Sequence, residues 1–226
     1  MTPAAIESLR RAAAHVLVDD VATPVFDDAT EHHVFRVLRL RDGEMVTVTD
    51  GRGRWRVCRA SGGTIEPVGD EQFDPAPTNP LTIAFAIPKQ DRPEWIVQKL
   101  TELGVDHIVV VHAERSVVRW DAERAVKHIE KLQRVAIEAT QQSRRVWLPT
   151  VTGPTAASEV LPGAAAAEPG GREIGPTDRI VAVGPEGGWS PSELDLAGAT
   201  VSLGPTVLRV ETAALAAAVR ASVHSS

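Results

Sequence analysis

The sequence predicts a small β-barrel-like domain at residues 1–73, followed by an α/β domain at residues 74–226. Three observations lead to this prediction. Short strand-like runs separated by Asp-Gly and Gly-Gly turns fill the first third of the chain. The stretch DPAPTNP at 74–80 holds three prolines, which neither pair in a central strand nor continue a helix. Beyond it, apolar runs of strand length alternate with helical patterns, as in a mostly parallel sheet covered by helices.

The first domain is expected to contain four strands, HVLV at 15–18, MVTVTD at 45–50, WRVCRA at 55–60 and TIEPV at 64–68. The turn signals RDGE, DGRGR and SGGT lie between them, and their glycines supply the positive φ that tight hairpins need. The tip DGRGR carries two arginines. A charged tip of this kind is suited to contact with a polyanion.

The second domain is expected to alternate strands and helices. Its strands are expected at LTIAFAI (81–87), HIVVVHA (107–113), RIVAVG (179–184) and ATVSLG (199–204). One helix is expected to begin at the cap Asp91 and to end at Gly104, and a second to run from the cap Asp121 to about residue 143. Ligands of such sheets bind at the carboxyl ends of the strands.

The composition excludes several classes of protein. With 43% hydrophobic and 24% charged residues, the chain is typical of a folded globular protein rather than a disordered one. No apolar run approaches the roughly 20 residues that span a bilayer, and the N-terminus lacks the apolar core of a secretion signal, so a cytoplasmic protein without membrane contact is expected. Cys58 is the single cysteine, which rules out an internal disulfide. The side chains of the adjacent His32 and His33 diverge, so no metal site is expected.

The formal net charge is −6, but the basic residues gather in two zones. Between Arg36 and Arg59 seven arginines face three acids, and between Arg115 and Trp147 eight basic residues face four acids. Two basic zones on an acidic chain suit selective contact with phosphates, whereas a uniformly basic surface binds nucleic acid indiscriminately. Ordinary solvated faces are the alternative explanation of each zone.

Two loops rich in glycine and proline lie close together near the C-terminus, VGPEGGWSPSE at 183–193 and LGPTVLRVETA at 203–213. Each leaves an expected strand and leads into an expected helix. In the first loop Gly187 and Gly188 allow a ligand to approach the backbone closely, while Ser190 and Glu193 have the spacing of a capping box. The loops predict a pocket built largely from backbone, with a tight structural turn as the alternative.

The residues of the first loop also limit what it binds. Neither G-x-x-x-x-G-K-[ST] nor G-x-G-x-x-G occurs in the chain, which argues against a nucleotide hydrolase and against a Rossmann dinucleotide site. Glu186 stands in the middle of the loop, where its charge would repel a phosphate but tolerate a neutral or cationic ligand. A ligand with an adenine ring and a sulfonium centre fits these terms.

The same residues carry a resemblance to a known family. The paired loops resemble the C-terminal motifs of the SPOUT superfamily of RNA methyltransferases. More narrowly, the chain is similar to the family that methylates N3 of a uridine in the decoding region of bacterial 16S ribosomal RNA. The likeness extends in order to EHHVFRVLRLRDGE at 31–44, AIPKQDRPEWIVQKLTELGV at 86–105 and ERS at 114–116.

The resemblance implies an N-terminal PUA-like RNA-binding β-barrel and an α/β SPOUT domain whose C-terminal part is a trefoil knot. It also implies that S-adenosylmethionine binds in the knot, held largely by loop backbone, and that the protein is a homodimer acting on 16S ribosomal RNA or the small ribosomal subunit. The cofactor-binding residues implied are Val183, Gly184, Gly188, Leu203, Gly204, Val207 and Leu208.

The implied reaction assigns roles to further residues. Methylation of uracil N3 requires loss of a proton and stabilisation of the negative charge left on the ring. Arg209 is the candidate for stabilising that charge, with a salt bridge to Glu211 or Glu186 as the alternative role, and Glu186 either assists proton removal or organises the loop. The residues expected to contact RNA phosphates are Arg36, Arg39, Arg41, Arg54, Lys89, Lys99 and Arg115.

Two features depart from the family's pattern. Thr206 stands where the second motif usually has a basic residue. Between Val160 and Asp178 the chain reads LPGAAAAEPGGREIGPT, and no strand is expected there, although the family normally has a strand and an acidic turn. Two other functions therefore stay open: a SPOUT enzyme with another target, such as a ribose 2′-hydroxyl, and a ribosome-assembly factor with a damaged pocket.

Overall fold

The computed structural model describes residues 2–88 and 92–223. The chain forms two compact units. The first comprises the residues up to Pro77 together with Thr140–Leu148, and the second comprises Thr78–Ala139 and the chain from Pro149 onward. The sequence pattern placed a boundary slightly earlier, between residues 73 and 74, and did not indicate that 140–148 packs with the first unit.

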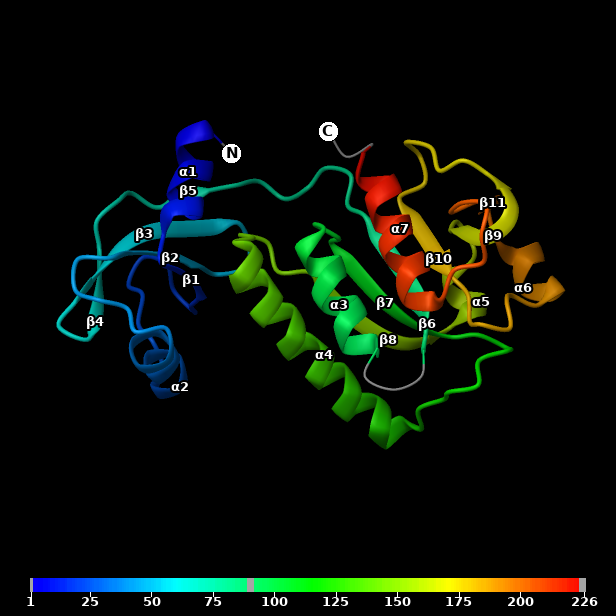
Figure 1. Ribbon diagram of the computed structural model, residues 1–226, viewed down its shortest axis with the longest axis horizontal. Helices are drawn as coiled ribbons and strands as arrows, with labels where there is room; N and C mark the ends of the chain where they lie inside the picture. Colours follow the sequence, from blue (N-terminus) through cyan, green and yellow to red (C-terminus); the bar gives the residue numbers. More distant parts are fainter. Residues whose placement is uncertain (1, 89–91, 224–226) are drawn as a thin grey trace. The chain divides into compact units, whose positions relative to one another are not determined.

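The first unit is built on a five-stranded sheet (Figure 1). Its strands are β1 (Ala14–Leu17), β2 (Met45–Thr49), β3 (Arg54–Ser61), β4 (Thr64–Pro67) and β5 (Gln72–Phe73), preceded by the helix α1 (Pro3–Arg11). β1 runs parallel to β2, whereas β3 is antiparallel to β2, β4 and β5. The four strands expected from the sequence are all present, with ends shifted by a residue or so.

The hairpin between β2 and β3 turns at the expected tip, residues 50–54. Gly53 is required there because its φ is 93° and because a Cβ would lie 2.3 Å from the carbonyl oxygen of Asp74 and 2.8 Å from the ring of Trp147. The Trp147 Nε1 donates to that same Asp74 oxygen at 3.0 Å. One side of the hairpin tip is therefore packed rather than free.

The returning segment Thr140–Leu148 is hydrogen-bonded into the first unit. The backbone N–H of Gly53 donates to the carbonyl oxygen of Val146 at 2.9 Å. The buried ring of His15, on β1, places Nε2 2.9 Å from the carbonyl oxygen of Arg145. These contacts explain why the end of a long helix belongs to the unit that precedes it in the sequence.

A short irregular helical segment lies between β1 and β2. It consists of α2 (Asp28–Glu31) followed directly by a turn of π-helix, η1 (His32–Val37). Shortly after it, Arg39 has a φ of 57°, in the left-handed region that non-glycine residues seldom adopt. π-Helical turns and left-handed residues are frequent at functional sites. Three of the arginines expected to contact RNA lie in or next to this segment.

The second unit contains a six-stranded sheet in which every neighbouring pair is parallel, as the sequence predicted for most of it. Its strands are β6 (Thr82–Ala86), β7 (His107–His112), β8 (Thr150–Ala156), β9 (Ala165–Arg172), β10 (Ile180–Val183) and β11 (Ala199–Val201). Across the sheet the order is β11-β9-β10-β6-β7-β8.

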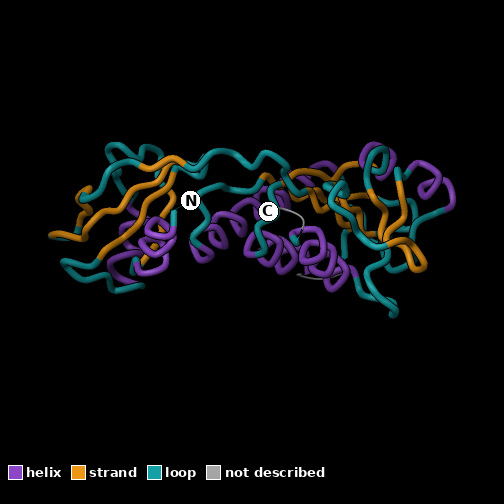
Figure 2. Tube along the Cα trace, turned by 90° about the horizontal axis from the view of Figure 1, so that it is seen from above, coloured by secondary structure: helices purple, strands orange, loops and turns teal. Residues whose placement is uncertain are grey.

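Helices cover both faces of this sheet (Figure 2). They are α3 (Arg92–Glu102), α4 (Ala122–Ser143), α5 (Ala157–Val160), α6 (Pro191–Leu196) and α7 (Val210–Ser222). Successive strand residues point to opposite faces, so Phe85 packs with residues of α3 and α7, while Ala84 packs on the other face with Trp189. That second core cluster consists largely of alanines.

The expectation that no strand lies between Val160 and Asp178 was wrong. Residues 165–172 form β9, which pairs with β10 on one side and β11 on the other. The strand begins with three alanines, whose low strand propensity hides it, but their small side chains fit the tightly packed sheet. The strand's end is fastened by the two hydrogen bonds that the Arg172 guanidinium donates to the Asp178 carboxylate at 2.6 and 2.7 Å.

Candidate active site

A cavity of about 290 Å³ lies at the carboxyl ends of the adjacent strands β11, β9 and β10. It is formed by the middle of β9, where its pairing with β10 ends, and by the two loops that follow β10 and β11. Its lining residues are Ala167, Glu168, Pro169, Val183, Gly184, Pro185, Glu186, Gly187, Gly188, Trp189, Leu203, Gly204, Thr206, Val207, Leu208 and Ala213. All seven residues that the resemblance implied for cofactor binding, and also Glu186, are therefore brought together in one cavity.

The first loop is shaped by its glycines and by the helix that follows it. A Cβ on Gly184 would lie 3.0 Å from the Trp189 ring, and Gly188 has a φ of 70° with open space where a side chain would stand. The expected capping box is present: the Ser190 hydroxyl accepts from the Glu193 N–H, and the Glu193 carboxylate accepts from the Ser190 N–H. The loop backbone is thus exposed to the cavity and anchored where α6 begins.

The second loop connects β11 to α7. Gly204 has a φ of 144°, again with open space at the position of a Cβ. Leu203 and Leu208 pack against the main core, whereas Val207 is 89% exposed. The start of the loop is held by the Ser202 N–H, which donates to the carbonyl oxygen of Arg172 at 2.8 Å. The apolar part of the cavity wall is therefore continuous with the core.

Among the described residues that line this cavity, Glu168 and Glu186 are the only ones with ionisable side chains. Glu186 is exposed, and Glu168 is partly buried in the middle of β9, directly after the residues that pair with β10. Glu168 was not among the site residues predicted from the sequence; its signal was a lone acid between an alanine run and Pro-Gly-Gly. Two acids, with no cation among the described lining residues, favour a positively charged ligand over a phosphate.

Arg209 lies beside the cavity but is not one of its lining residues. It is the exposed N-cap residue of α7 and follows Val207 and Leu208 directly. Its alternative partner Glu211 is instead paired with Arg92 of α3, at 3.1 Å. Within the described residues Arg209 forms no ion pair, so its guanidinium is available at the cavity's edge.

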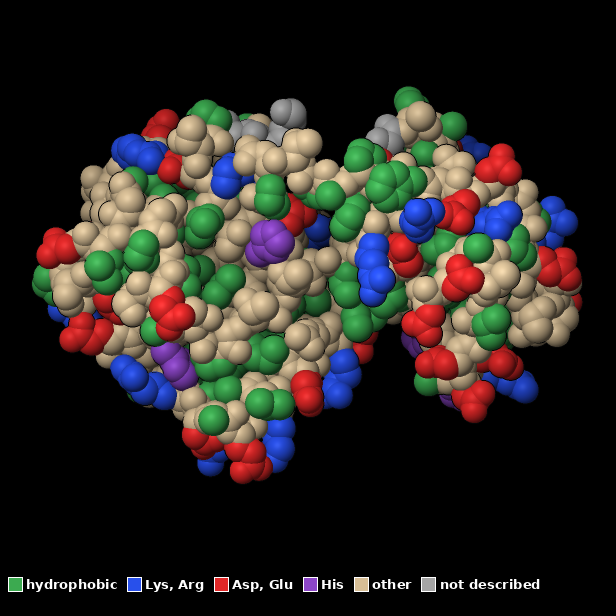
Figure 3. Space-filling model, turned by 180° about the vertical axis from the view of Figure 1, so that it is seen from behind, with side chains coloured by type: hydrophobic (Ala, Val, Ile, Leu, Met, Phe, Trp, Pro, Cys, Tyr) green, Lys and Arg blue, Asp and Glu red, His purple; other side chains and the backbone are tan. Residues whose placement is uncertain are grey.

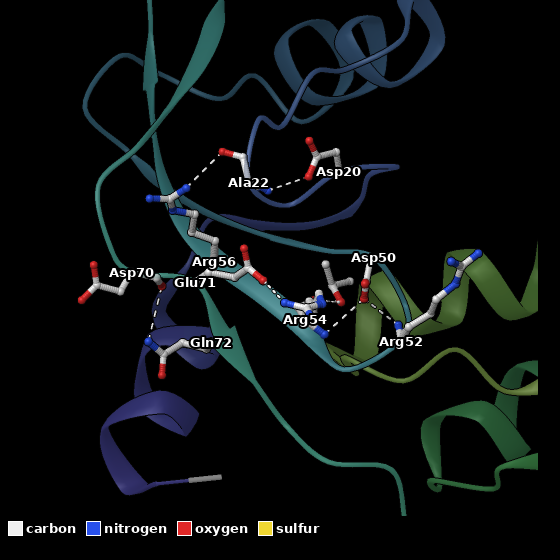
Figure 4. A network of polar contacts seen from close by, with 10 residues as sticks. Asp20, Ala22, Asp50, Arg52, Arg54, Arg56, Asp70, Glu71 and Gln72 are labelled. Atoms are coloured by element: carbon white, nitrogen blue, oxygen red, sulfur yellow. Dashed lines mark hydrogen bonds and ion pairs between the residues drawn. The ribbon is translucent and has the colours of Figure 1, made fainter.

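The arginines expected to contact RNA from the first unit fall into two groups. Arg36, Arg39 and Arg41 are exposed and form no ion pair with any described residue. The Arg54 side chain is instead paired with Glu71 (Figure 4). It also lies over the ring of Phe73, 5.6 Å from the ring centroid. On the face of each unit that Figure 3 shows, basic and acidic side chains are interspersed rather than gathered in one basic patch.

The side chains of the second unit that were expected to contact RNA also differ in the hydrogen bonds that they already form within the protein. Lys99 is bonded to both carboxylate oxygens of Glu102, at 2.7 and 2.9 Å. The Nη1 of Arg115 donates to the carbonyl oxygens of Gly187 and Trp189 in the first loop, at 3.2 and 3.0 Å. Lys89 lies outside the described residues.

The described parts of the chain contain no cluster of three or more potential metal ligands. No helix among the described residues is long and apolar enough to cross a membrane.

Comparison with known proteins defines the class to which this fold and site belong. A family model described as "RNA methyltransferase domain" matches residues 74–222, and one described as "RNA methyltransferase PUA domain" matches residues 26–61. The unit that holds the cavity is therefore an RNA methyltransferase domain.

Individual relatives narrow the class to a family. "Ribosomal RNA small subunit methyltransferase E" of Mycobacterium bovis is 34% identical over 229 residues, covering 89% of this chain and 86% of the relative. The protein of the same name from Bacillus subtilis is 30% identical over 213 residues, covering 81% and 83%. The chain belongs to this family of ribosomal RNA small subunit methyltransferases.

Solved structures agree with this assignment. A probable rRNA methyltransferase from Porphyromonas gingivalis is 31% identical with a TM-score of 0.76, covering 94% of this chain and 98% of that one. A ribosomal RNA small subunit methyltransferase E from Neisseria gonorrhoeae bound to S-adenosylmethionine is 28% identical with a TM-score of 0.77, covering 91% and 95%. The ligand of the Neisseria protein is the cofactor expected from the present sequence.

Proposed function

We propose that this protein uses S-adenosylmethionine to methylate N3 of a uridine in the decoding region of 16S ribosomal RNA. The observation that carries the proposal is the cavity at the ends of β9, β10 and β11, which gathers every residue implied for cofactor binding. The Mycobacterium and Bacillus relatives, named for methylation of small-subunit ribosomal RNA, support the substrate, and the Neisseria structure supports the cofactor.

The charge of the cavity and its lining of glycine backbone and apolar side chains suit S-adenosylmethionine. The cofactor carries a positive sulfonium and a positive amino group, and the carboxylates of Glu168 and Glu186 complement them. Gly188 and Gly204 leave open space where a side chain would stand, so backbone and apolar lining residues such as Leu208 would hold the adenine and ribose. When bound, the cofactor supplies an electrophilic methyl group.

The chain's own residues then act on the uracil. N3 lies on the Watson–Crick edge, so the base must be unpaired before it reaches the cavity. Arg209, at the cavity's edge and free of ion pairs with described residues, stabilises the negative charge that forms on the ring. Glu186 is exposed within the first loop and accepts or relays the N3 proton. Holding acceptor and donor in line supplies much of the acceleration.

RNA contact is assigned to both units. The exposed Arg36, Arg39 and Arg41 contact phosphates in the first unit, with a smaller contribution from Arg54, whose charge is already paired. The five-stranded sheet and the match to a PUA domain support a PUA-like barrel as the RNA-binding part. Lys89, Lys99 and Arg115 complete the proposed contacts in the second unit.

Three further properties belong to this proposal. The first is a trefoil knot, supported by the path of the chain from the edge strand β11 back to α7, which packs on β6 and β10 within the sheet. The second is a homodimer, as the resemblance implies. The third is a cytoplasmic location, where ribosomal RNA is the substrate.

Transfer of label from radioactive S-adenosylmethionine to small ribosomal subunits that lack the modification tests the proposed activity. Label in the 16S RNA, lost when Arg209 is replaced by alanine, is the expected result. Failure of a folded protein that binds S-adenosylmethionine to label either subunits or naked RNA would contradict it. The assembly-factor alternative rested on a missing strand, and the presence of β9 removes that support.

A further inference from the structure

The first cofactor loop is fastened to a segment that follows a different strand. Residues 113–116 leave β7, which is separated from β10 by β6 in the sheet order. The loop at 184–190 leaves β10. The two segments are about 70 residues apart in sequence, yet side chains of each bond to the backbone of the other. These bonds form a clamp made of Arg115 and Glu193.

Arg115 forms one half of the clamp. Its Nη1 lies 3.2 Å from the carbonyl oxygen of Gly187 and 3.0 Å from that of Trp189. The side chain also packs on the loop, because a Cβ on Gly187 would lie 3.4 Å from the Arg115 Cβ. A single guanidinium thus spans the part of the loop that contains two of the cavity glycines, Gly187 and Gly188.

Glu193 forms the other half. One carboxylate oxygen accepts from the Ser190 N–H at 2.9 Å, which is its capping-box bond. The other accepts from the N–H of Glu114 at 2.7 Å. Glu193 is 7% exposed, unlike a capping residue at an open helix end. Its charge is held between two backbone donors from separate segments, which makes each bond stronger than one between neutral groups.

We propose that Arg115 and Glu193 are positioning residues that preorganise the first loop for S-adenosylmethionine. The inference rests on the proposed function, and it assigns Arg115 a role in addition to the phosphate contact expected from the sequence. Glycine-rich backbone loses much conformational entropy on ordering, so a loop that is ordered before binding binds more tightly. The clamp supplies that order from outside the loop.

Arg115 suits this role because of its position and its donor geometry. Its two acceptors are carbonyl groups two residues apart, and Nη1 lies within hydrogen-bond distance of both while the residue as a whole is exposed. A lysine at the same place would offer one compact charge and would hold the loop less well.

The Glu193→Gln change keeps the shape of the side chain but replaces one of the two acceptor oxygens with a donor.

The test compares Arg115→Ala, Arg115→Lys and Glu193→Gln with Arg124→Ala as the matched control. Arg124 is an exposed arginine of the same unit, and its ion pair to Asp121 is long at 3.5 Å. Two measurements are made without RNA: hydrogen exchange of the amides at 186–190, and the Kd for S-adenosylmethionine by calorimetry. A third is the RNA Kd without cofactor, and a fourth is kcat and KM for methyl transfer.

Arg115→Ala is expected to speed exchange in the loop and to raise the Kd for S-adenosylmethionine about tenfold. The KM for the cofactor should rise with it, while kcat at saturating cofactor stays within about threefold of the wild type. For Arg115→Lys and Glu193→Gln, the exchange rate of the loop and the Kd for S-adenosylmethionine should lie between those of the wild type and those of Arg115→Ala. Arg124→Ala should match the wild type in both measurements.

Unchanged loop exchange in Arg115→Ala, or faster exchange with an unchanged cofactor Kd, would overturn the positioning role. A loss of RNA affinity alone would leave Arg115 as a phosphate contact only and would also overturn it. A wild-type protein that binds no S-adenosylmethionine would instead refute the proposed function, and the exchange measurement would still decide whether the clamp orders the loop.

Discussion

The Nε2 of His15 lies 2.9 Å from the carbonyl oxygen of Arg145, joining β1 to a segment 130 residues later in the chain. Because a carbonyl oxygen only accepts, Nε2 carries the proton, and Nδ1 accepts from the Thr47 hydroxyl at 2.8 Å. Both ring nitrogens of the neutral imidazole are therefore used. Burial lowers the pKa of His15 from 6.5 to about 4, and the nearby charge of Arg144 adds to this effect.

This relationship predicts how the stability of the first unit depends on pH. The folded pKa lies below the unfolded one, so the unfolded state takes up the proton first. The unfolding free energy that the neutral, buried His15 contributes is fully present above pH 6.5 and is lost as the pH falls toward 4. We expect the wild type to lose about 2 kcal/mol of unfolding free energy from this group between pH 7.5 and pH 5. Urea unfolding of wild type and His15→Gln at both values measures it, and equal pH dependence of the two proteins would contradict it.

Replacement of Arg209 should separate catalysis from cofactor binding. The side chain does not line the cavity, so Arg209→Ala should leave the Kd for S-adenosylmethionine within about twofold of the wild type. Loss of one charge-stabilising donor should lower kcat by about 10²–10³-fold. Arg220→Ala, at the far end of the same helix, is the control. A large rise in the cofactor Kd with little change in kcat would argue against the assigned role.

The two cavity carboxylates should contribute unequally to cofactor affinity. Glu168 is partly buried and Glu186 is exposed, and a charge interaction is stronger where water is excluded. Glu168→Gln is expected to raise the Kd for S-adenosylmethionine about tenfold, and Glu186→Gln about threefold or less. Calorimetry at low and high salt checks both values, since only the Glu186 effect should fade with salt. The reverse order would mean that the cofactor's charges face the first loop instead.

The arginines of the first unit should differ in how much they add to RNA affinity. Arg36→Ala, Arg39→Ala and Arg41→Ala should each reduce the slope of log K against log salt by about 0.7–0.9, as expected for the loss of one phosphate contact. Arg54→Ala should reduce it less, because that guanidinium is paired with Glu71 in the free protein (Figure 4). Filter binding of 16S RNA fragments over a salt series measures the slopes. An equal loss for Arg54 would show that its ion pair opens on binding.

Much of the fold was predictable because the strands that matter most are apolar. β6, β7 and β10 read as continuous hydrophobic runs, as expected for strands buried on both faces. β9 occupies an inner position but begins with Ala165–Ala167, and alanine favours helices and is depleted in strands. Its place in the sheet depends on packing against neighbouring strands, which a local pattern does not contain.

The two loops that form the site could be predicted from the sequence, but the long-range contacts that hold the first loop in place could not. The two motifs identified the cavity residues because glycine and proline at those spacings constrain the backbone directly. The partner of Arg115 lies 72 residues away in Gly187, and Glu193 reaches Glu114 across 79 residues. Nothing local in ERS distinguishes an arginine that holds a loop from one that contacts a phosphate. Such roles become visible only in the folded chain.

Identification of the modified nucleoside tests the central claim most directly. Small ribosomal subunits lacking the modification are incubated with the protein and S-adenosylmethionine, and the 16S RNA is digested and analysed by mass spectrometry against nucleoside standards. The account predicts N3-methyluridine, formed by the wild type and lost in Arg209→Ala. A ribose-methylated nucleoside or a methylated base other than uracil would contradict it and would assign the cavity to a different RNA position.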